Sequence, residues 1–380
     1  MRTPFVTTPR AINPEHDSVS TNRHHRILIL NWRDHVHPNA GGAEMYTQRV
    51  AMEWVKMGHS VTLFCSSAPG YSSDEVVNGL RTIRRGSKHT VYREAKHFYR
   101  REGRGQYDLI IDEVNTRPFL TPKWVKDASS IALIHQVCRN IWFYEYSLPI
   151  ALVGRFILEP WWLRAYRNVP TITVSPSSAN SLKCYGLHNI KIIPEGMDQI
   201  ISDIEIKRET EPTLIFVGRL AANKRPNEAI EAFRFVRQEI PTAKMWIIGS
   251  GPMESNLRKL PYEGIEFLGR VSEVEKRARL ARAHILVVTS VREGWGLVVT
   301  EAAQCGTIAV GYDVPGLRDS IQASGGQLSA SEPFELGQKI INILSKSYKQ
   351  RIKNVAPSGV ATWSHVAQEI LQYANDELGR

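Results

Sequence analysis

Short apolar runs alternate with amphipathic stretches along most of this chain. The run RILILN at residues 26–31 has polar flanks, and a glycine-containing loop and the amphipathic stretch AEMYTQRVAMEWVKMG follow it. This order predicts a strand, a loop and a helix that ends near Gly58. Later runs that also predict strands are VTLFC, YDLIID, SSIALIHQ, PTITVS and IKIIPEG. Strands that alternate with helices predict a parallel sheet covered on both faces.

The same alternation starts again after a polar segment, Asp198 to Pro212. The runs TLIFVGR, AKMWIIGSG, IEFLG, HILVVTS and TIAVGY predict the strands of a second sheet. Helices are predicted at Pro226 to Glu239, near Met253 to Leu260 and after Gly296. Because 380 residues exceed what one typical core holds, we expect two α/β domains with the polar segment as their linker.

The chain divides into four parts on this basis. Residues 1–25 lack the apolar core of a secretory signal and are expected to form a disordered leader. Residues 26–200 and 201–361 are the two expected domains, and residues 362–380, with apolar positions at helical spacing, are a terminal helix. In two such domains the carboxyl ends of the strands border a cleft, where ligands of α/β proteins bind.

Composition narrows the class of partner. The formal net charge is +10 and the pI is near 9.4, which favours anionic partners such as nucleotides, phosphorylated lipids or a membrane surface. No RNP, helix-turn-helix or zinc-finger pattern accompanies the basic residues, so nucleic acid is not an expected partner. The four cysteines are scattered, without a CxxC pair or a Cys/His metal spacing, which predicts a reduced, cytosolic protein.

Two loops that follow predicted strands carry candidate anion ligands. Gly41 and Gly42 open the first helix, where backbone N–H groups can approach an anion without interference from a Cβ atom. The pair is not part of a Walker A loop, and a tight turn without a ligand is the alternative. Arg219 and Lys224 lie between a strand end and the helix that begins at Pro226. They are either a clamp for a diphosphate leaving group or two solvated loop cations.

The stretch REGWGLVVTE, Arg292 to Glu301, holds two separated carboxylates. Glu293 lies in the loop after a predicted strand, and Glu301 is about one turn into the following helix. The two acids are a catalytic couple, two ligands of sugar hydroxyls, or an unconnected loop acid and helix-surface acid. If both grip one elongated ligand, the backbone amides of Gly294 to Leu297 face its phosphates between them.

Three other features have alternative interpretations. His135 ends a strand of the first domain and is either structural or a polar contact at the cleft. The loop GSGPMES lacks the third glycine of a dinucleotide signature, and FLGRV, Phe267 to Val271, has backbone groups suited to a base edge. The segment Trp142 to Tyr166 is rich in aromatic residues but too interrupted by charges to span a bilayer. It is either an interfacial amphipathic surface or part of the domain core.

Together these motifs resemble the retaining glycosyltransferases of family 4, which have the GT-B fold of two Rossmann-like domains facing across a cleft. The resemblance rests on GGAE, IH at a strand end, TVSPSSANSL, VGRLAANK, GSGP and the E-x7-E element EGWGLVVTE followed by AAQCGTIAV. It covers nearly the whole chain beyond the leader. It implies a nucleotide-sugar donor bound mostly by the C-terminal domain, no metal or other cofactor, and a terminal helix that crosses back to the N-terminal domain.

The resemblance also implies how the phosphates are bound. The amide of Gly42, beside Gly41, would bind the distal phosphate, while Arg219 and Lys224 would clamp the diphosphate. Retention requires a nucleophile or a same-face attack, and no carboxylate is placed by sequence as a covalent nucleophile. The hypothesis is a dissociative, same-face displacement in which the leaving diphosphate is a candidate acceptor of the proton.

The sugar and base contacts are implied in the same way. Glu293 would bind hydroxyls of the transferred sugar, Glu301 those of the ribose, and His135 the sugar near the reacting centre. The catalytic set would then be Arg219, Lys224, Glu293 and His135. The remaining implied contacts are Gly294, Trp295, Gly296, Leu297 and Val271 on the donor side, and Glu44 and Arg139 on the acceptor side. The usual Asn-Gly-Val-Asp turn appears here as Glu195-Gly196-Met197-Asp198, which leaves its local contact open.

The expected function is transfer of a hexose from a UDP- or GDP-sugar to a hydroxyl acceptor, in the synthesis of a glycolipid, a cell-surface glycan or a glycosylated metabolite. The protein is expected to be cytoplasmic, and its acceptor is expected to be lipid-linked. Residues 142–167 are further expected to make peripheral contact with an anionic membrane at the inner face of the plasma membrane. Alternatives are another GT-B enzyme (a phosphorylase or a sugar-nucleotide epimerase), or a non-catalytic nucleotide-sugar-binding or membrane-docked protein. No lysine motif for a phosphorylase cofactor accompanies these residues.

Overall fold

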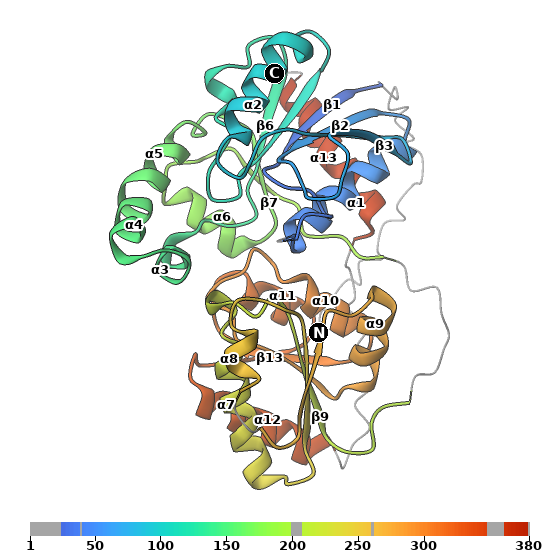
Figure 1. Cartoon of the computed structure of the whole chain (residues 1–380), viewed down its shortest axis with the longest axis vertical. Coiled ribbons are helices and arrows are strands. Elements are labelled where there is room, and N and C mark those ends of the chain that lie inside the picture. The colour runs from blue at the N-terminus through green and yellow to red at the C-terminus, as the bar shows by residue number, and fades with distance from the viewer. Residues whose placement is uncertain (1–23, 39, 199–206, 260–261, 348–360, 379–380) are drawn as a thin grey trace, which may run out of the picture.

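Two β-sheets, each with helices on both faces, make up the computed structural model, which describes residues 24–38, 40–198, 207–259, 262–347 and 361–378 (Figure 1). The N-terminal sheet lies in the upper half of the view and the C-terminal sheet in the lower half. The expected leader lies almost entirely outside the described residues, as does the middle of the expected linker, residues 199–206.

The N-terminal domain has an eight-stranded sheet of order β3-β4-β2-β1-β5-β6-β7-β8. The strands are β1 (Arg26–Leu30), β2 (Ser60–Cys65), β3 (Asp74–Val77), β4 (Leu80–Arg84), β5 (Leu109–Glu113), β6 (Ser129–Leu133), β7 (Thr171–Thr173) and β8 (Ile190–Ile192). The helices are α1 (Gly42–Lys56), α2 (Val91–Phe98), α3 (Trp142–Glu145), α4 (Leu148–Val153), α5 (Glu159–Arg164) and α6 (Pro176–Lys183), with short helical turns η1 (Tyr99–Gly103), η2 (Thr121–Lys123), η3 (Arg139–Ile141) and η4 (Gly154–Leu158). The central strands are buried along nearly their whole length, as their continuous apolar runs require.

One edge of this sheet departs from the expected parallel order. β3 pairs antiparallel with β4, and the turn between them contains Asn78 and Gly79 at φ 50° and 84°. Asn-Gly with both residues in the left-handed region is the preferred turn of a two-residue hairpin. The prediction of a wholly parallel sheet is therefore wrong at this edge, because the hairpin lies outside the βα alternation on which it rested.

The C-terminal domain has a six-stranded parallel sheet of order β11-β10-β9-β12-β13-β14. The strands are β9 (Thr213–Val217), β10 (Lys244–Ile248), β11 (Ile265–Gly269), β12 (Ile285–Val288), β13 (Ile308–Tyr312) and β14 (Gln327–Ser329). The helices are η5 (Ala222–Lys224), α7 (Pro226–Glu239), α8 (Glu254–Leu257), α9 (Glu273–Arg282), α10 (Leu297–Gln304), α11 (Leu317–Ala323) and α12 (Pro333–Ser347). Pro226 occupies the first position of α7, where its missing N–H costs nothing. The order β9-β12 in the middle of the sheet brings two loop-bearing strand ends side by side at the cleft.

The last helix, α13 (Trp363–Leu378), packs on the N-terminal domain and not on its own neighbour α12. Figure 1 shows it as a red helix beside α1 and the blue strands. Val366 and Ile370 are buried in the same apolar cluster as Val50, and the indole N–H of Trp54 donates to Ala367 O at 2.9 Å. The chain therefore crosses between the domains twice.

The two crossings run side by side. Met197 N–H donates to Ala361 O at 2.9 Å, and a Cβ atom on Gly196 would lie 2.8 Å from the Trp363 ring. Next to them, Asp198 Oδ2 accepts from Arg49 of α1 at 3.0 Å and from Arg277 of α9 at 2.9 Å. Asp198 thus bridges one helix from each domain at the point where the chain passes between them.

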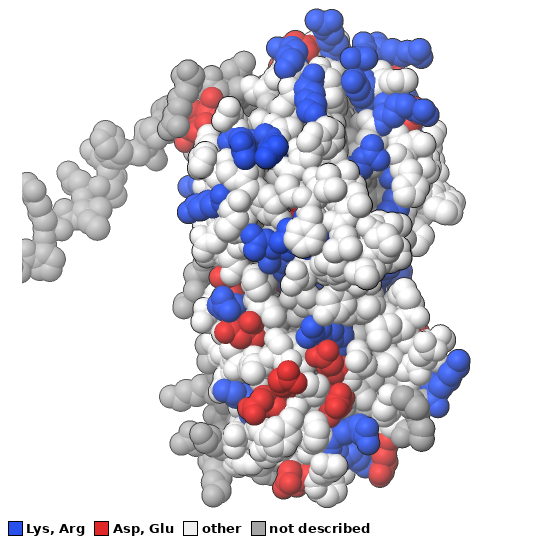
Figure 2. Space-filling model, turned by 90° about the vertical axis from the view of Figure 1, so that its left-hand side faces the viewer, with Lys and Arg blue, Asp and Glu red and all other residues white. Residues whose placement is uncertain are grey.

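The aromatic segment Trp142 to Tyr166 forms an amphipathic surface on the N-terminal domain. Its buried side chains include Trp142, Ala151 and Leu163, which pack inwards. Its exposed large apolar side chains are Phe143, Tyr144, Tyr146, Leu148, Ile150, Leu152, Val153, Phe156, Ile157 and Trp161. Figure 2 shows that basic side chains predominate over the N-terminal half of one face, whereas acidic and basic ones mix over the C-terminal half. Among the described residues, no helix combines the length and apolar content needed to cross a membrane.

Candidate functional site

The N-termini of α1 and α10 face each other between the two domains. A Cβ atom on Gly42, the first residue of α1, would lie 3.4 Å from Cδ1 of Leu297, the first residue of α10. The residues that precede these helices are Gly41 and Gly296, which have no side chain to cap the first N–H groups. Two helix N-termini without an N-cap side chain at one place favour an anion between them.

Glu44 holds the first turn of α1. Its side chain is fully buried, forms an ion pair with Arg33 Nε at 2.8 Å and accepts the Gly41 N–H at 2.7 Å. A carboxylate used in this way fixes the start of the helix. Both of its oxygens thus contact groups of the same domain, and the acceptor-side role predicted for Glu44 stays a prediction.

The GSG sequence supports the loop that carries Arg219. Gly249 has φ 130°, and a Cβ atom there would lie 1.9 Å from Gly218 O, while one on Gly251 would lie 2.5 Å from Leu220 O. These glycines therefore allow two strand-end loops to pack backbone against backbone. Arg219 itself is exposed, and no ion pair of its guanidinium is found in the described part of the chain.

Lys224 and Glu293 are brought into direct contact. Lys224 Nζ forms an ion pair with Glu293 Oε1, which also accepts a hydrogen bond from Ser290 Oγ at 2.6 Å. The two side chains are 28% and 14% exposed, so the pair remains accessible from the cleft. The hydroxyl of Thr289, at the end of β12, lies 2.9 Å from Lys224 O and ties η5 to this strand. Lys224 and Glu293, which follow two different strands, thus form one ion-paired cluster at the cleft.

The loop from Glu293 to Leu297 is wedged between the domains. A Cβ atom on Gly294 would lie 3.0 Å from His135 O, so the loop backbone lies directly against the N-terminal domain. The Trp295 indole is buried in the same apolar cluster as Tyr46 and Trp363. The Trp295 side chain is therefore a packing contact between the domains, and the phosphate contact predicted for its backbone amide stays a prediction.

Glu301 has a different cationic partner from Glu293. It pairs with Lys276 of α9 at 2.9 Å, and Glu273 lies 2.8 Å from the same ammonium. Burial opposes the charge on Lys276, but Glu301 and Glu273 outweigh it and raise the pKa of the lysine. The two acids of the E-x7-E element therefore pair with different lysines, Glu293 with Lys224 and Glu301 with Lys276.

The predicted base-contact region directly precedes α9, the helix that carries Lys276. Val271, after β11, is half-buried against the C-terminal core. Its neighbour Arg270 donates from Nη2 to Pro38 O at 2.8 Å and from Nε to Ser250 Oγ at 2.8 Å. This arginine links the C-terminal domain to the β1–α1 loop beside the region predicted to meet the base.

His135 lies beneath the Gly294 contact with a buried acid beside it. Its Nδ1 is 3.7 Å from Glu195 Oε1, and its ring meets the edge of Tyr46 at a centroid distance of 4.9 Å. Burial disfavours the imidazolium, but Glu195, with Glu113 further off, outweighs it and raises the pKa of His135. Burial likewise raises the pKa of Glu195. Neither ring nitrogen has a well-formed hydrogen bond among the described residues, so the ring retains donor capacity for a ligand.

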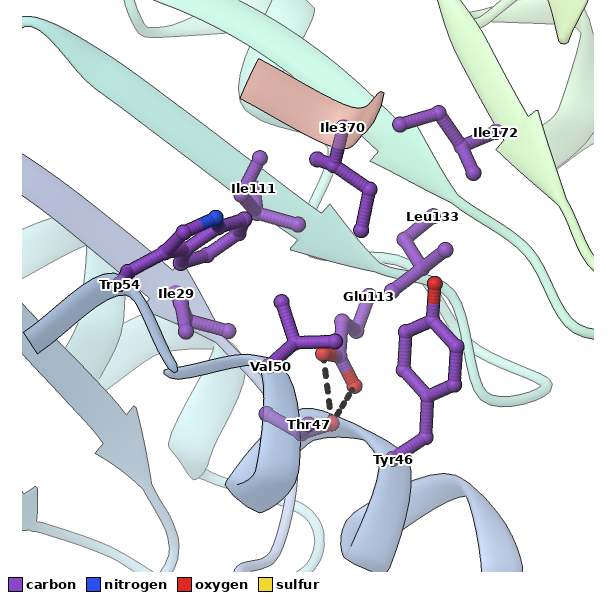
Figure 3. A pocket seen from close by; sticks show the side chains of 10 residues that line it. All are labelled: Ile29, Tyr46, Thr47, Val50, Trp54, Ile111, Glu113, Leu133, Ile172 and Ile370. Atoms are coloured by element: carbon purple, nitrogen blue, oxygen red, sulfur yellow. Dashed lines mark hydrogen bonds between the residues drawn. The ribbon is translucent and has the colours of Figure 1, made fainter. Parts of the chain in front are cut away.

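A second buried acid, Glu113, lies at the end of β5 under α1 (Figure 3). Its oxygens accept hydrogen bonds from Thr47 Oγ1 at 2.6 Å and from Asn31 Nδ2 at 2.5 Å. Burial raises its pKa to about 8, although His135 opposes the shift. The carboxylate borders a cavity of about 10 Å³, close to the smallest that admits one water molecule. Sequence reasoning missed Glu113 because only its burial distinguishes it from an ordinary strand-end acid.

Arg139 starts η3 on the N-terminal side of the cleft. Its φ of 44° is unusual for a residue other than glycine, and its N–H is held by Glu159 Oε2 at 3.0 Å. An open groove of about 500 Å³ lies between the domains next to it. The residues that line this groove are Asn140, Phe143, Tyr144, Arg225, Val291, Val314 and Ser331. The arginine that was predicted on the acceptor side thus adjoins an interdomain groove.

Comparison with known proteins assigns the chain to a family. The model described as "Glycosyltransferase Family 4" matches residues 40–199, and that described as "Glycosyl transferases group 1" matches residues 197–357. The two matches meet at the crossing beside Asp198, so each corresponds to one of the observed domains.

Similar proteins extend over almost the whole chain. A GDP-mannose-dependent alpha-(1-6)-phosphatidylinositol dimannoside mannosyltransferase of Mycobacterium tuberculosis (strain ATCC 25177 / H37Ra) is 24% identical over 362 residues, covering 88% of this chain and 92% of that protein. Sucrose-phosphate synthase from Thermosynechococcus elongatus has a TM-score of 0.73 at 18% identity, covering 94% of this chain and 100% of the other. HepE of Anabaena in complex with UDP-glucose has a TM-score of 0.69 at 15% identity, covering 93% of this chain and 100% of the other. The chain is therefore a glycosyltransferase of family 4, with the GT-B fold.

Proposed function

We propose that this protein is a retaining, metal-independent transferase that moves a hexose from a nucleotide-diphosphate sugar to a hydroxyl group. The observation that carries the proposal is the Lys224–Glu293 pair, with Arg219 in the same loop as Lys224 and without an ion pair among the described residues, together with the N-termini of α1 and α10 that meet at Gly42 and Leu297. Two cations and two helix N-termini are suited to a diphosphate and to the negative charge that builds on it as it leaves. Their positive charge would act in place of a divalent metal ion.

Donor binding would exchange the ion pair for contacts with the ligand. Lys224 turns from Glu293 to the diphosphate, which leaves the carboxylate to accept hydrogen bonds from hydroxyls of the transferred sugar. Ser290, which donates to the same carboxylate at 2.6 Å, keeps Glu293 in position during this exchange. A partly exposed pair is suited to such an exchange because its net stabilisation is small.

Retention would follow from attack on the face that the diphosphate leaves. The acids of the cleft are engaged by neighbours: Glu293 by Lys224, Glu195 by His135 and Glu113 by Thr47. None is thereby poised as a covalent nucleophile. In the proposed step the bond from C1 to the phosphate oxygen breaks, the acceptor oxygen bonds to C1, and the acceptor proton passes to the leaving phosphate.

The acceptor is proposed to be lipid-linked and to be reached from the cytoplasmic face of a membrane. The exposed apolar residues between Phe143 and Trp161 would enter the interfacial region of the bilayer, as amphipathic surface helices do. The net charge of +10 favours anionic lipids. The mycobacterial relative is named for action on a phosphatidylinositol dimannoside, which supports a lipid of related chemistry here.

The donor is found by measuring thermal shifts with UDP-, GDP- and dTDP-sugars, because a ligand that binds only the folded state raises the melting temperature. With the best donor and a mixed lipid extract as acceptor source, free nucleoside diphosphate is then measured with and without EDTA, and NMR gives the anomeric configuration of the product. We expect release that EDTA does not abolish, and retention. Stabilisation without release in any acceptor mixture would favour a non-catalytic binder, and EDTA-sensitive release restored by Mg²⁺ would overturn the metal-independent mechanism.

Membrane contact is tested by co-sedimentation with phosphatidylcholine vesicles with and without phosphatidylglycerol. Trp161→Ser and Phe156→Ser should reduce binding several-fold. The matched control is Phe334→Ser, because Phe334 and Trp161 are both 52% exposed but Phe334 lies on α12 of the other domain. Equal binding by all three variants and the wild type would remove residues 142–167 as the contact.

A further inference from the structure

Two arginines, Arg139 and Arg292, lie at the domain boundary and pair with no carboxylate of the described residues. Arg292 is 7% exposed, and its Nη2 reaches across to Ser181 Oγ of α6 at 2.5 Å. The Nε atoms of both arginines are buried and have no hydrogen-bond partner among the described residues. Neither guanidinium forms an ion pair within the described ranges. Buried guanidinium groups are normally paired, so these two need an explanation.

The two guanidinium groups lie over the same part of the N-terminal domain. Arg292 contacts Ser181, while Arg139 lies over the ring of Tyr185, about one turn further along, with its Cζ 5.7 Å from the ring centroid. Burial lowers the pKa of Arg292, and the positive charge of Arg139 lowers it further. The half-buried Arg139 therefore repels a buried like charge, which little water screens.

Glu159 offsets part of this charge without forming an ion pair with either arginine. Glu159 accepts the backbone N–H groups of Cys138 and Arg139, and also the Tyr185 hydroxyl at 3.2 Å. Arg155 adds a third guanidinium, which donates to the same hydroxyl at 3.2 Å. The cluster thus holds three arginines around the single carboxyl group of Glu159. Burial raises the pKa of this carboxyl group.

We propose that Arg139 and Arg292 bind a phosphate group of the acceptor. Guanidinium groups match phosphate oxygens with paired, charge-assisted hydrogen bonds, and a bound phosphate would remove the repulsion between them. The inference rests on the proposed function, because it concerns the acceptor of the same reaction.

The pair has the position that such an acceptor requires. Arg292 immediately precedes Glu293, and Arg139 follows His135 by one short turn, so a phosphate held here lies beside the proposed sugar site. Asn140 and Val291, the next neighbours of the two arginines, line the interdomain groove. An elongated acceptor can therefore place a hydroxyl at the reacting centre, its phosphate at the arginines and its remaining part in the groove.

The groove also leads towards the exposed apolar surface. Phe143 and Tyr144 of α3 line it, and Leu148 and Ile150 of the next helix are 63% and 54% exposed. A phospholipid headgroup would reach the arginines from this side, whereas a soluble sugar phosphate would enter from the cleft. The phosphate chemistry is the same in both cases.

The test is calorimetric titration of the full chain, saturated with the nucleoside diphosphate that binds best, with inorganic phosphate and with glycerol 3-phosphate. Saturation fills the donor site, so that phosphate reports a second site. We expect wild-type binding that Arg139→Gln and Arg292→Gln weaken about tenfold or more, while Arg292→Lys retains part of it. The control is Arg85→Gln, since Arg85 pairs with Glu102 on the surface of the same domain and is 38% exposed.

Each alternative result has a definite meaning. Absence of phosphate binding to the saturated wild type, or unchanged binding by both glutamine variants, overturns the inference while the donor function stands. Equal losses of nucleotide and phosphate affinity would assign the arginines to the donor. If no nucleotide binds, the proposed function fails. The phosphate site is then tested by titrating the nucleotide-free Arg219→Gln variant with phosphate. Loss of phosphate binding in this variant would assign the phosphate to Arg219 and overturn the inference about Arg139 and Arg292.

Vesicles separate the two sources of phosphate. Addition of phosphatidylinositol to phosphatidylcholine vesicles should increase binding of the wild type, and Arg139→Gln should remove this increment if the ligand is a lipid headgroup. Trp161→Ser should instead lower binding to both kinds of vesicle. Binding of glycerol 3-phosphate with no phosphatidylinositol increment supports the site with a soluble phosphorylated acceptor.

Discussion

The two halves of the cleft treat charge in opposite ways. In the C-terminal half, charged side chains neutralise each other at accessible positions, as Lys224 and Glu293 do at 28% and 14% exposure. In the N-terminal half, His135, Glu195 and Glu113 are buried, and both nitrogens of the histidine lack a well-formed hydrogen bond among the described residues. Apart from Arg219 and Arg292, the site charges of the C-terminal half thus form exchangeable pairs, whereas His135 and Glu195 are buried with hydrogen-bonding capacity that no other described residue uses.

The contrast fits the two substrates that the halves are proposed to bind. A pair near solvent costs little to separate, so a diphosphate can replace one partner without a large penalty. A buried polar group without a partner costs stability in the free protein, and such groups are concentrated at functional sites. We infer that the donor side acts by exchange of ion pairs and the acceptor side by a rigid arrangement that a ligand completes.

The largest expected effect comes from removing the exchangeable cation. Lys224→Ala should lower nucleoside diphosphate release about 1000-fold, equivalent to roughly 4 kcal/mol in the barrier, because the leaving group loses a charge that stabilises it. Circular dichroism and melting temperature should change little. Lys244→Ala, which breaks the more exposed surface pair with Glu211, is the control and should leave turnover unchanged. Near-wild-type turnover in a folded Lys224→Ala protein would contradict the exchange model.

The next effect concerns the tryptophan that joins the halves. Trp295→Ala should reduce the free energy of unfolding by roughly 3–5 kcal/mol, since the indole is 6% exposed in the N-terminal cluster. Small-angle scattering should also show a larger radius of gyration if the wedge holds the domains together. Trp161→Ala, at an exposed site, should change neither the free energy of unfolding nor the radius of gyration. An unchanged radius with normal stability would show that the wedge is dispensable.

Glu113 tests the buried half through pH. Its pKa is raised from 4.5 to about 8, so stability associated with the neutral carboxyl is complete below pH 4.5 and is lost as the pH rises towards 8. Relative to Glu113→Gln, the wild type should therefore lose a few kcal/mol (roughly 1.4 per pKa unit) of unfolding free energy across this range. Urea unfolding of both proteins at several pH values measures the difference. Parallel pH profiles would mean that Glu113 has an ordinary pKa.

The smallest effect is expected at the crossing between the domains. Asp198→Asn should cost less than about 1 kcal/mol, because Asp198 is 29% exposed and its partners Arg49 and Arg277 are each 43% exposed. The loss should shrink in high salt, where exposed pairs are screened. Measurement of the unfolding free energy at low and high ionic strength tests this salt dependence. The control is Arg81→Gln, which breaks the surface pair with Asp74. A cost of several kcal/mol would show that the bridge is a structural lock.

Local pattern accounted for most of the fold. The helix predicted at Pro226 to Glu239 has these bounds in the structure, and the predicted strands overlap the observed ones. The β3–β4 hairpin was not predicted, although the Asn-Gly pair at Asn78 was a usable signal. α8 is shorter than its predicted range, ending at Leu257. These differences occur where a turn or a short segment carries too few residues for a periodic pattern.

Some residues of the candidate site could be predicted from the sequence and others could not. Arg219, Lys224 and Glu293 could be found because they follow apolar runs and therefore lie at strand ends. Glu195 had a weak signal, since it replaces the usual asparagine of its turn, and Arg292 had none. Their importance depends on burial and on contacts with distant parts of the chain, which a sequence pattern does not record.

The sequence by itself determined the two parallel α/β domains and the strand-end loops of the site, because the spacing of apolar side chains is a local property that each element must satisfy. Only the tertiary structure decided which charges meet. It paired Lys224 with Glu293, buried the side chains of Glu44 and Trp295, and left Arg139 and Arg292 without an ion pair among the described residues. Charge compensation depends on distance and on exclusion of water, and both arise only when remote segments pack together.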